Sequence, residues 1–379
     1  MIDDIGEYSL QKHKELKGKI EVTLKDTLDS QLKLSTFYTP GVGYVSSYIA
    51  DHESEAREYT WLNNNVAVIS DGTAVLGLGD IGPLASLPVM EGKCMLLKHF
   101  ANIDAVPIIL DVHKPKEIIS AVKAIAPSFG AINLEDIAAP TCFEVEEELI
   151  KSLNIPIMHD DQHGTAIVVL AGLINACKVV GKKLEEAKVV IIGAGAAGVA
   201  VAKLVHLYAR PNITVVDSQG IIHPKRPGLS IEKQFLARFN KIKHPKNTLR
   251  HALMGADIVI GVSRANLLTA EDIRFMNKDS IVFALANPVP EIMPTTALSA
   301  GVRVVATGRS DFPNQINNVL AFPGIFRGAL DNRISKITEQ HKVLAAEAIA
   351  KLVKNPTPEK IVPSVFEEKL VQTVSRVIK

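Results

Sequence analysis

The sequence has few cysteines, few aromatic residues and almost no net charge, and each shortage excludes a class of protein. Its 379 residues include three cysteines, Cys94, Cys142 and Cys177. They lie far apart and form no CxxC pair, so we expect neither a disulfide framework nor a thiolate metal site, and a reducing cytoplasm fits. Only 5% of the residues are aromatic and the formal net charge is +1. Nothing in this balance predicts a general attraction to nucleic acid or to an acidic membrane surface.

Long apolar runs are also missing. The longest, at 166–177, contains Asn175 and is too short to cross a bilayer, so we expect no membrane insertion. The N-terminal residues are rich in lysine and carry no apolar segment, which argues against a signal peptide. We interpret the densest basic cluster as a solvated surface; it consists of Lys241, Lys243, His244 and Lys246. With 47% hydrophobic residues, the chain is long enough to form two globular domains.

The strongest positive signal is a strand, a glycine turn and a helix at 188–217. An apolar run leads into Gly193-Ala194-Gly195-Ala196-Ala197-Gly198, and a small-residue helix is predicted to follow. In this spacing the first glycine makes the turn, the second lets the backbone approach a pyrophosphate, and the third lets the helix pack on the strand. A second apolar run ends in Asp217, whose carboxylate could accept hydrogen bonds from an adenosine ribose. The order of these elements predicts a dinucleotide site, although a GxGxxG turn alone also occurs in ordinary βαβ units.

Two acidic pairs suggest a metal site. Glu135-Asp136 follows the apolar run 131–134, and Asp160-Asp161 follows the run 155–159. If the runs are neighbouring strands, their carboxylates converge in one crevice, where they repel one another unless a cation lies between them. Carboxylate oxygens suit Mg²⁺ or Mn²⁺. The residues alone are also compatible with a second interpretation, in which each pair is the N-cap and acidic first turn of a helix and binds no metal.

The rest of the chain predicts an α/β protein. Residues 1–34 are predicted to form a helical lead-in, because apolar residues recur every four positions at 20–32. The runs 65–70 and 74–79 suggest the two strands of a hairpin. Lys93 falls in a helix at 90–98, and runs at 257–260, 280–284 and 302–305 suggest further buried parallel strands. Asn287 lies just past one of these strands. Helical patterns at 334–353 and 365–378 close the chain, and the second has an apolar stripe that must pack on something.

Taken together, these segments resemble the malic enzyme family, in its short bacterial form, over nearly the whole chain. The motifs that carry the resemblance are Tyr38-Thr39-Pro40-Gly41-Val42, Gly77-Leu78-Gly79-Asp80-Ile81-Gly82-Pro83, Glu91-Gly92-Lys93, Leu134-Glu135-Asp136-Ile137, His159-Asp160-Asp161-Gln162-His163-Gly164-Thr165-Ala166, Asn287-Pro288 and Asn317-Asn318-Val319. Some of these motifs are weak alone, but their order along the chain is specific to this family. The resemblance implies a malic-type substrate and metal domain at 1–160, and a Rossmann-type, doubly wound NAD(P)-binding domain with terminal helices at 161–379.

By the same resemblance, the reaction is the oxidative decarboxylation of L-malate to pyruvate and CO₂. Glu135, Asp136 and Asp161 match the family's metal ligands. Lys93 matches the general base, Asp160 the residue that holds it, and Tyr38 the acid that protonates C3. The substrate's carboxylates would be held by Asn287, Asn317 and Asn318, with Asn287 also near the cofactor. A homodimer is implied.

Two points stay open at the level of sequence. In larger family members an arginine before the Gly-Leu-Gly segment grips the substrate, whereas here Ala74 occupies the matching position. Asp217 favours NAD over NADP, although Lys225 and Arg226 could reach a 2′-phosphate.

Two alternative functions are also open: a dehydrogenase of another small hydroxy acid that does not decarboxylate, and a catalytically silent dinucleotide-binding protein.

Overall fold

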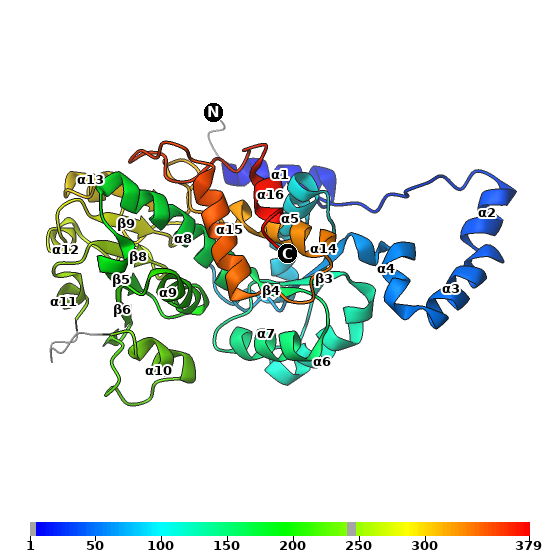
Figure 1. The fold of residues 1–379 in the computed structure, drawn as a ribbon, viewed down its shortest axis with the longest axis horizontal. Coiled ribbons are helices and arrows are strands. Elements are labelled where there is room, and N and C mark those ends of the chain that lie inside the picture. Colours follow the sequence, from blue (N-terminus) through cyan, green and yellow to red (C-terminus); the bar gives the residue numbers. More distant parts are fainter. Residues whose placement is uncertain (1–4, 241–247) are drawn as a thin grey trace.

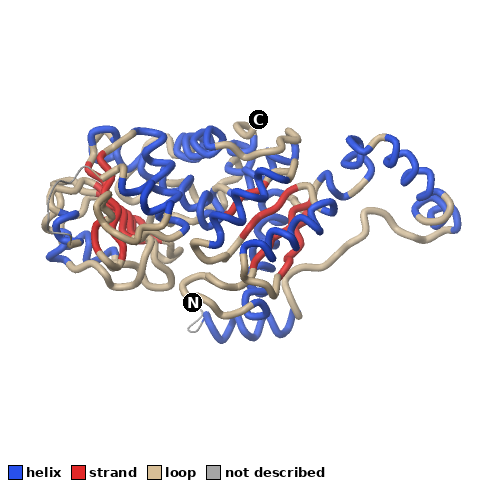
Figure 2. Tube along the Cα trace, turned by 90° about the horizontal axis from the view of Figure 1, so that it is seen from below, coloured by secondary structure: helices blue, strands red, loops and turns tan. Residues whose placement is uncertain are grey.

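The computed structural model describes residues 5–240 and 248–379 and arranges them around two β-sheets (Figures 1 and 2). The basic cluster of Lys241, Lys243, His244 and Lys246 lies outside the described residues. Both sheets are covered by helices, which confirms the predicted α/β class. The division of the chain at residue 160 stays a prediction.

The first sheet is fully parallel, with strand order β2-β1-β3-β4. Its strands are β1 (Asn65–Ser70), β2 (Asp104–Ile109), β3 (Ala131–Leu134) and β4 (Ile157–His159). One face packs on α5 (Pro83–Ala101), and the other packs on α6 (Pro115–Ile125) and α7 (Thr141–Ser152). All residues of β1 are buried, as expected for a central parallel strand whose sequence is apolar on both faces.

The second sheet has strand order β10-β9-β8-β5-β6-β7. Only the short edge strand β7 is antiparallel. The strands are β5 (Lys188–Ile192), β6 (Asn212–Asp217), β7 (Gly220–Ile221), β8 (Ile258–Gly261), β9 (Ile281–Ala284) and β10 (Val304–Thr307). Because β6 and β8 lie on opposite sides of β5, the sheet is doubly wound, and ligands of such sheets collect where the strand order reverses.

Two layers of helices cover this second sheet. α8 (Asp160–Val180) and α9 (Ala196–Ala209) share a core with one face of the sheet. The other face packs on α11 (Leu249–Leu253), α12 (Ala270–Ile273) and α13 (Pro294–Ser299), while α10 (Ile231–Ala237) lies at the β6 side (Figure 1). By length and composition α8 could cross a membrane, but most of it is buried inside the molecule, which is the environment of a core helix.

The C-terminal helices pack back on the first sheet. α14 (Phe322–Asp331) contacts α5, and Arg327 donates from Nη1 to Oδ1 of Asn64 at 2.6 Å. α15 (Glu339–Lys351) lies against α8, and α16 (Leu370–Ser375) lies against α14. In the predicted stripe of 365–378, Leu370 and Val374 are buried, so much of this stripe packs within the chain itself.

Two local predictions were wrong. The helical lead-in is interrupted: α1 (Ile5–Leu16) and α2 (Gln31–Phe37) flank a segment without helix. Leu24 and Leu28 of this segment are exposed in the described structure, and a helix that packs on nothing is marginal in water. The hairpin also fails, because both edges of β1 are already paired with β2 and β3. Residues 74–79 instead form a loop with a single bridge between Val75 and Gly79.

The segment between α1 and β1 forms an arm that extends away from both sheets (Figures 1 and 2). It carries α2 and α3 (Gly41–Asp51), and α4 (Ala56–Tyr59) lies at its base, where Arg57 donates from Nη2 to the carbonyl oxygen of Gly130 at 2.5 Å. None of the residues in these three helices is buried. Several large apolar side chains of the arm are strongly exposed, among them Leu24, Leu32, Phe37 and Tyr44.

Candidate active site

Three carboxylates meet at the carboxyl edge of the first sheet. Glu135 and Asp136 follow β3, and Asp161 lies in the first turn of α8, directly after β4. Because β3 and β4 are neighbouring parallel strands, their ends lie side by side. One oxygen from each acid lies within 4.8 Å of the other two. Asp136 has a φ of 52°, a left-handed conformation that costs a non-glycine residue about 1 kcal/mol or more and is typical of functional sites.

The carboxylates are held close together although their charges repel. Burial raises the pKa of Asp136 to about 8 and that of Asp161 to about 6, and neighbouring carboxylates add to both effects. Burial also raises the pKa of Glu135, against the opposing charge of Lys93. The Oδ2 atom of Asp136 is buried and has no hydrogen-bond partner among the described residues. An all-carboxylate set with an unpartnered oxygen fits a hard divalent cation such as Mg²⁺ or Mn²⁺.

Lys93 lies beside this cluster on α5. Its side chain is 7% exposed, and Nζ lies 2.8 Å from Oε1 of Glu135 and 2.7 Å from Oδ2 of Asp160. Burial alone would lower the pKa of Lys93, but the attraction of Asp160, Glu135 and Asp161 is larger and raises it. Burial raises the pKa of Asp160 to about 7 despite its bond to Lys93. Lys93, Glu135 and Asp160 therefore form one buried charge cluster.

Gly164 is required by the position of Asp160. A Cβ atom on Gly164 would lie 1.9 Å from Oδ1 of Asp160 and 3.0 Å from Cβ of Asn318. A side chain there would displace the carboxylate that holds Lys93. The glycine in the segment from His159 to Ala166 therefore makes room for this pair.

Glu146 of α7 is a residue of the site that the sequence analysis missed. Its side chain is buried and accepts from the backbone N of His159 at 2.8 Å, from Gln162 Nε2 at 3.2 Å, and lies 2.9 Å from His163 Nε2. The other ring nitrogen of His163 lies 2.9 Å from Nζ of Lys342 on α15. Glu146 thus links the start of α8 directly to α7, and His163 extends this link to α15 through Lys342. A helical-wheel pattern could have found it, because Cys142, Val145 and Leu149 place it beside the buried face.

The glycine turn shows the close approaches that its spacing predicts. Gly193 has a φ of 117°, and a Cβ atom there would lie 2.4 Å from the carbonyl oxygen of Val262. A Cβ atom on Gly198 would lie 2.0 Å from the carbonyl oxygen of Gly193, whereas one on Gly195 would meet no atom within 4 Å. The backbone at Gly195 is therefore open to a ligand, and Ala194 precedes it. Ala196 and Ala197 form the first turn of α9.

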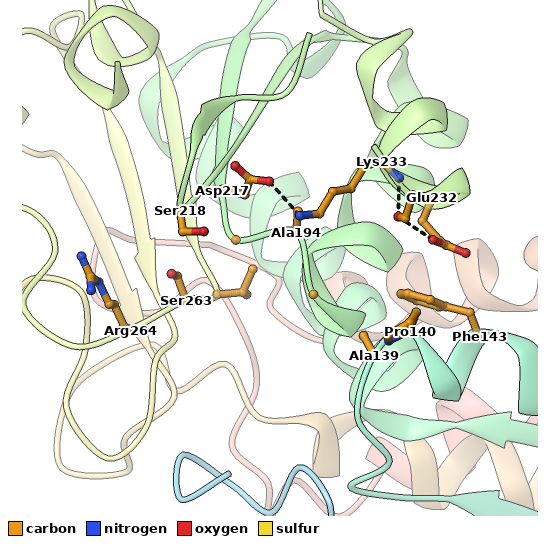
Figure 3. A pocket seen from close by; sticks show the side chains of 14 residues that line it. Ala139, Pro140, Phe143, Ala194, Asp217, Ser218, Glu232, Lys233, Ser263 and Arg264 are labelled. Atoms are coloured by element: carbon orange, nitrogen blue, oxygen red, sulfur yellow. Dashed lines mark hydrogen bonds and ion pairs between the residues drawn. The ribbon is translucent and has the colours of Figure 1, made fainter. Parts of the chain in front are cut away.

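A cavity of about 580 Å³ lies against this turn (Figure 3). Its lining includes Gly193, Ala194 and Gly195 together with Asp217 and Ser263. Ala139 and Pro140, which follow the Asp136 loop in the first half of the chain, line it from the other side. The size and the glycine backbone fit part of a dinucleotide, and the cavity opens between the two halves of the chain.

Asp217 lies at the end of β6, as the sequence predicts, but its carboxylate is already engaged in ion pairs. Arg226 and Lys233 both pair with its carboxylate. Burial would raise the pKa of Asp217, but these two cations outweigh it and lower the pKa to about 2.

The three candidate asparagines differ in their surroundings. Asn287 lies between two glycines: a Cβ atom on Gly77 would lie 1.9 Å from its carbonyl oxygen, and one on Gly308 would lie 2.9 Å from its Nδ2. Asn318 lies near Asp160, as its contact with Gly164 shows. The side chain of Asn317 instead accepts from the backbone N of Val319 at 3.0 Å and caps a short 3₁₀ turn.

Tyr38 is not brought to the other candidates within one chain. It caps the C-terminal end of α2, and its side chain is 67% exposed. In Figure 1, α2 lies on the projecting arm, whereas β3 and β4, which the acids follow, lie in the body of the molecule.

Comparison with known proteins identifies the family to which the chain belongs. The family model for the malic enzyme N-terminal domain matches residues 17–150, and the model for the malic enzyme NAD-binding domain matches residues 162–378. The chain belongs to the malic enzyme family. An NAD-dependent malic enzyme of Geobacillus stearothermophilus is 52% identical over 366 residues, which cover 95% of this chain and 76% of that protein.

Two further malic enzymes illustrate the closeness of the relationship. The bifunctional malic/malolactic enzyme of Bacillus subtilis is 49% identical over 377 residues, covering 99% of this chain and 92% of that protein. The crystal structure of the NAD-dependent malic enzyme of Thermotoga maritima superposes with a TM-score of 0.95 at 48% identity and covers 98% of both chains. The fold described above is therefore the malic enzyme fold over nearly the full length.

Proposed function

We propose that this chain oxidatively decarboxylates L-malate to pyruvate and CO₂ at the carboxyl edge of the first sheet, with NAD or NADP in the neighbouring cavity. The observation that carries the assignment is buried Lys93, paired with Glu135 and Asp160 beside a set of three carboxylates. A dehydrogenase that only transfers hydride has no need of such a carboxylate set. Glu135, Asp136 and Asp161 would hold Mg²⁺ or Mn²⁺, and the glycine turn would hold the cofactor's pyrophosphate.

The bound groups supply two kinds of chemistry: the cation stabilises negative charge on the C2 oxygen of malate, and NAD(P) accepts hydride from C2. Lys93 takes the proton of the C2 hydroxyl at its Nζ. The attraction of Glu135 and Asp161 helps to raise the pKa of Lys93 in this structure. A cation held by these two carboxylates would offset their negative charge and so weaken this effect on the pKa of Lys93. Asp160 keeps the amine in place through Oδ2. Asn287 and Asn318 position the substrate's carboxylates.

Decarboxylation follows from the keto group at C2. The bond between C3 and C4 breaks, CO₂ leaves, and the electron pair moves towards the C2 oxygen. The enolate of pyruvate so formed then receives a proton at C3, and the Tyr38 hydroxyl is the proposed donor.

Substitution of Lys93 tests the base assignment, and Lys98 on the same helix is a matched control because its side chain is 55% exposed. Lys93→Met should lower kcat for malate oxidation by about a thousandfold, while Mn²⁺ binding measured by calorimetry persists. Lys98→Met should change neither. Near-normal turnover of Lys93→Met would refute the assignment.

The position of Tyr38 leads to a proposal about assembly. Tyr38 caps the C-terminal end of α2, on an arm whose large apolar side chains are exposed and which extends away from both sheets (Figure 1). A homodimer in which the arm of one copy packs on the other would cover these side chains and bring Tyr38 to the partner's site. Each active site would then be complete only in the dimer.

Coexpression of two inactive variants tests this arrangement. Lys93→Met chains still supply Tyr38, and Tyr38→Phe chains still supply Lys93. If the sites are shared between chains, random heterodimers contain one intact site each, and the mixture recovers about a quarter of wild-type activity. If Tyr38 serves its own chain, no heterodimer has an intact site and no activity returns. Sedimentation showing only monomer would also contradict the proposal.

We also infer a cytoplasmic location, supported by three free, buried cysteines and no disulfide among the described residues. Cell fractionation that places the protein outside the cytoplasm would contradict it.

A second activity is favoured by the similarity to the bifunctional malic/malolactic relative. In that activity hydride would return to C2 of pyruvate while pyruvate and the reduced cofactor both stay bound, a proton would add to the C2 oxygen, and lactate would leave with no net change in NAD. Lactate formed from malate with catalytic NAD would support it. Pyruvate and reduced cofactor in equal amounts, without lactate, would exclude it.

A further inference from the structure

Glu291 is a fully buried acid in the segment between β9 and α13. Burial raises the pKa of its carboxyl group, and the strongest opposing contributions come from backbone N–H groups, first that of Ala286 and then that of Ser263. Burying a carboxylate is costly unless its oxygens are hydrogen-bonded. The groups that donate to Glu291 therefore indicate what this residue holds in place.

The two oxygens of Glu291 join two loops. Oε1 accepts a hydrogen bond from the backbone N of Ser263 at 2.8 Å, in the loop after β8. Oε2 accepts one from the backbone N of Ala286 at 3.0 Å, in the loop after β9. The backbone supports the same junction, because the carbonyl oxygen of Glu291 accepts from the N of Leu268 at 2.9 Å. One side chain thus sets how far apart the two loops lie.

Each of these loops faces one of the two reactants of the proposed reaction. Residues 262–264 line the cavity beside the glycine turn, and Figure 3 shows Ser263 at its wall. Ala286 directly precedes Asn287, the candidate for binding the substrate's carboxylates. The strands β8 and β9 are parallel neighbours, so both loops leave the same edge of the sheet. Glu291 therefore connects the cofactor side of the site to its substrate side.

The end of β8 is shaped to admit this side chain. A Cβ atom on Gly261, the last residue of β8, would lie 2.5 Å from Cδ of Glu291 and 2.7 Å from Oε1. A side chain at position 261 would push the carboxylate away from its donors. The glycine and the glutamate therefore form one arrangement.

Only a carboxylate satisfies both loops at once. Both partners of Glu291 are N–H donors, and an ionised carboxylate accepts at each of its two oxygens. A glutamine of the same size has one carbonyl oxygen and one NH₂ group. The NH₂ group would face a second donor, and one of the two loops would lose its bond.

We propose that Glu291 is a positioning residue, which fixes the spacing between the loop that lines the cofactor cavity and the loop that carries Asn287. It acts through these loops and so aligns NAD(P) and malate for hydride transfer. The inference rests on the proposed function in taking these two molecules as the reactants.

Amide hydrogen exchange of the enzyme without cofactor, malate or metal tests the connection between the loops. Glu291→Gln should speed exchange at Ser263 or at Ala286 by at least about tenfold. Gly261→Ala displaces the carboxylate without changing its charge and should have the same effect. Peptides of β1, in the other sheet, should keep wild-type exchange. Glu271→Gln is the matched control, because its side chain is 74% exposed, and it should match wild type throughout.

The first turnover, followed by stopped flow, tests the consequence for hydride transfer. With malate and Mn²⁺ present, Glu291→Gln and Gly261→Ala should lower the rate constant of cofactor reduction by about thirtyfold. Malate deuterated at C2 should slow both variants at least as much as wild type. A purely structural role would lower only the amplitude, which counts folded enzyme, and would leave the rate constant unchanged.

Wild-type exchange at both Ser263 and Ala286 in the two variants would overturn the inference. So would rate constants equal to that of wild type. If Glu291→Gln does not fold, Gly261→Ala decides by the same two measurements. Failure of the wild-type enzyme to oxidise malate would instead contradict the proposed function, and hydrogen exchange would still decide whether Glu291 joins the loops.

Discussion

Replacing Glu146 by glutamine should destabilise the protein although Glu146 contacts none of the three carboxylates of the metal cluster. Burial would raise the pKa of this carboxyl group, but His163 and Lys342 outweigh burial and lower it from 4.5 to about 2. Since one pKa unit corresponds to about 1.4 kcal/mol, the folded state favours the ionised form by about 3 kcal/mol. Glutamine keeps the size of the side chain and removes the charge. We therefore expect Glu146→Gln to lower the free energy of unfolding by about 3 kcal/mol at pH 7.

The direction with pH follows from the lowered pKa. The contribution of Glu146 is complete above its ordinary pKa of 4.5 and is lost as the pH falls towards about 2. The stability gap between wild type and Glu146→Gln should therefore be about 1 kcal/mol smaller at pH 4 than at pH 7.

Urea unfolding followed by circular dichroism, at one fixed protein concentration and in EDTA, measures the gap without contributions from metal binding or assembly. Glu147→Gln is the matched control, because its side chain lies on the same helix, is 69% exposed and should change stability by less than about 0.5 kcal/mol. Equal stability of the Glu146 and Glu147 variants, or a gap that widens on acidification, would refute the reasoning.

Two further changes test the geometry of the site. Gly164→Ala would place a methyl group 1.9 Å from Oδ1 of Asp160 and should lower kcat about a hundredfold, whereas Gly92→Ala on α5, which meets only Lys19 Nζ at 4.0 Å, should leave steady-state kinetics unchanged. Similar kinetics for both variants would contradict the packing argument. Asp136→Asn should raise the melting temperature in EDTA, because burial and its neighbours raise the pKa of Asp136 to about 8 and so disfavour its charged form at neutral pH. The same variant should lose the stabilisation by Mn²⁺ that calorimetric melting detects in wild type, and a melting temperature that falls in EDTA would count against the cluster as a strained metal site.

Much of the chemistry could be predicted from the sequence because it depends on local patterns. The glycine turn with its two strands, and carboxylates at the ends of neighbouring strands, follow from apolar periodicity and spacing alone. Glu135, Asp136 and Asp161 meet because β3 and β4 pair, which is the simplest outcome for consecutive parallel strands.

What could not be predicted depends on which surfaces face one another. The four-residue apolar spacing at 20–32 indicated a helix, but Leu24, Leu28 and Leu32 are exposed in the part of the chain that the structure describes. Asp217 looked like a free acceptor because its partner Lys233 lies 16 residues away in a helix, and no spacing rule brings it back to β6. Tyr38 carries a family motif, yet it lies on the exposed arm, and no local pattern in the sequence indicates how such an arm packs.

The most direct test of the proposed reaction is the stoichiometry of products formed from L-malate, measured with NAD and with NADP, with Mn²⁺ and with EDTA. We predict equal amounts of pyruvate and reduced cofactor that appear only when Mn²⁺ is present. Reduced cofactor without pyruvate, or undiminished turnover in EDTA, would contradict the account of Lys93 and its three neighbouring carboxylates.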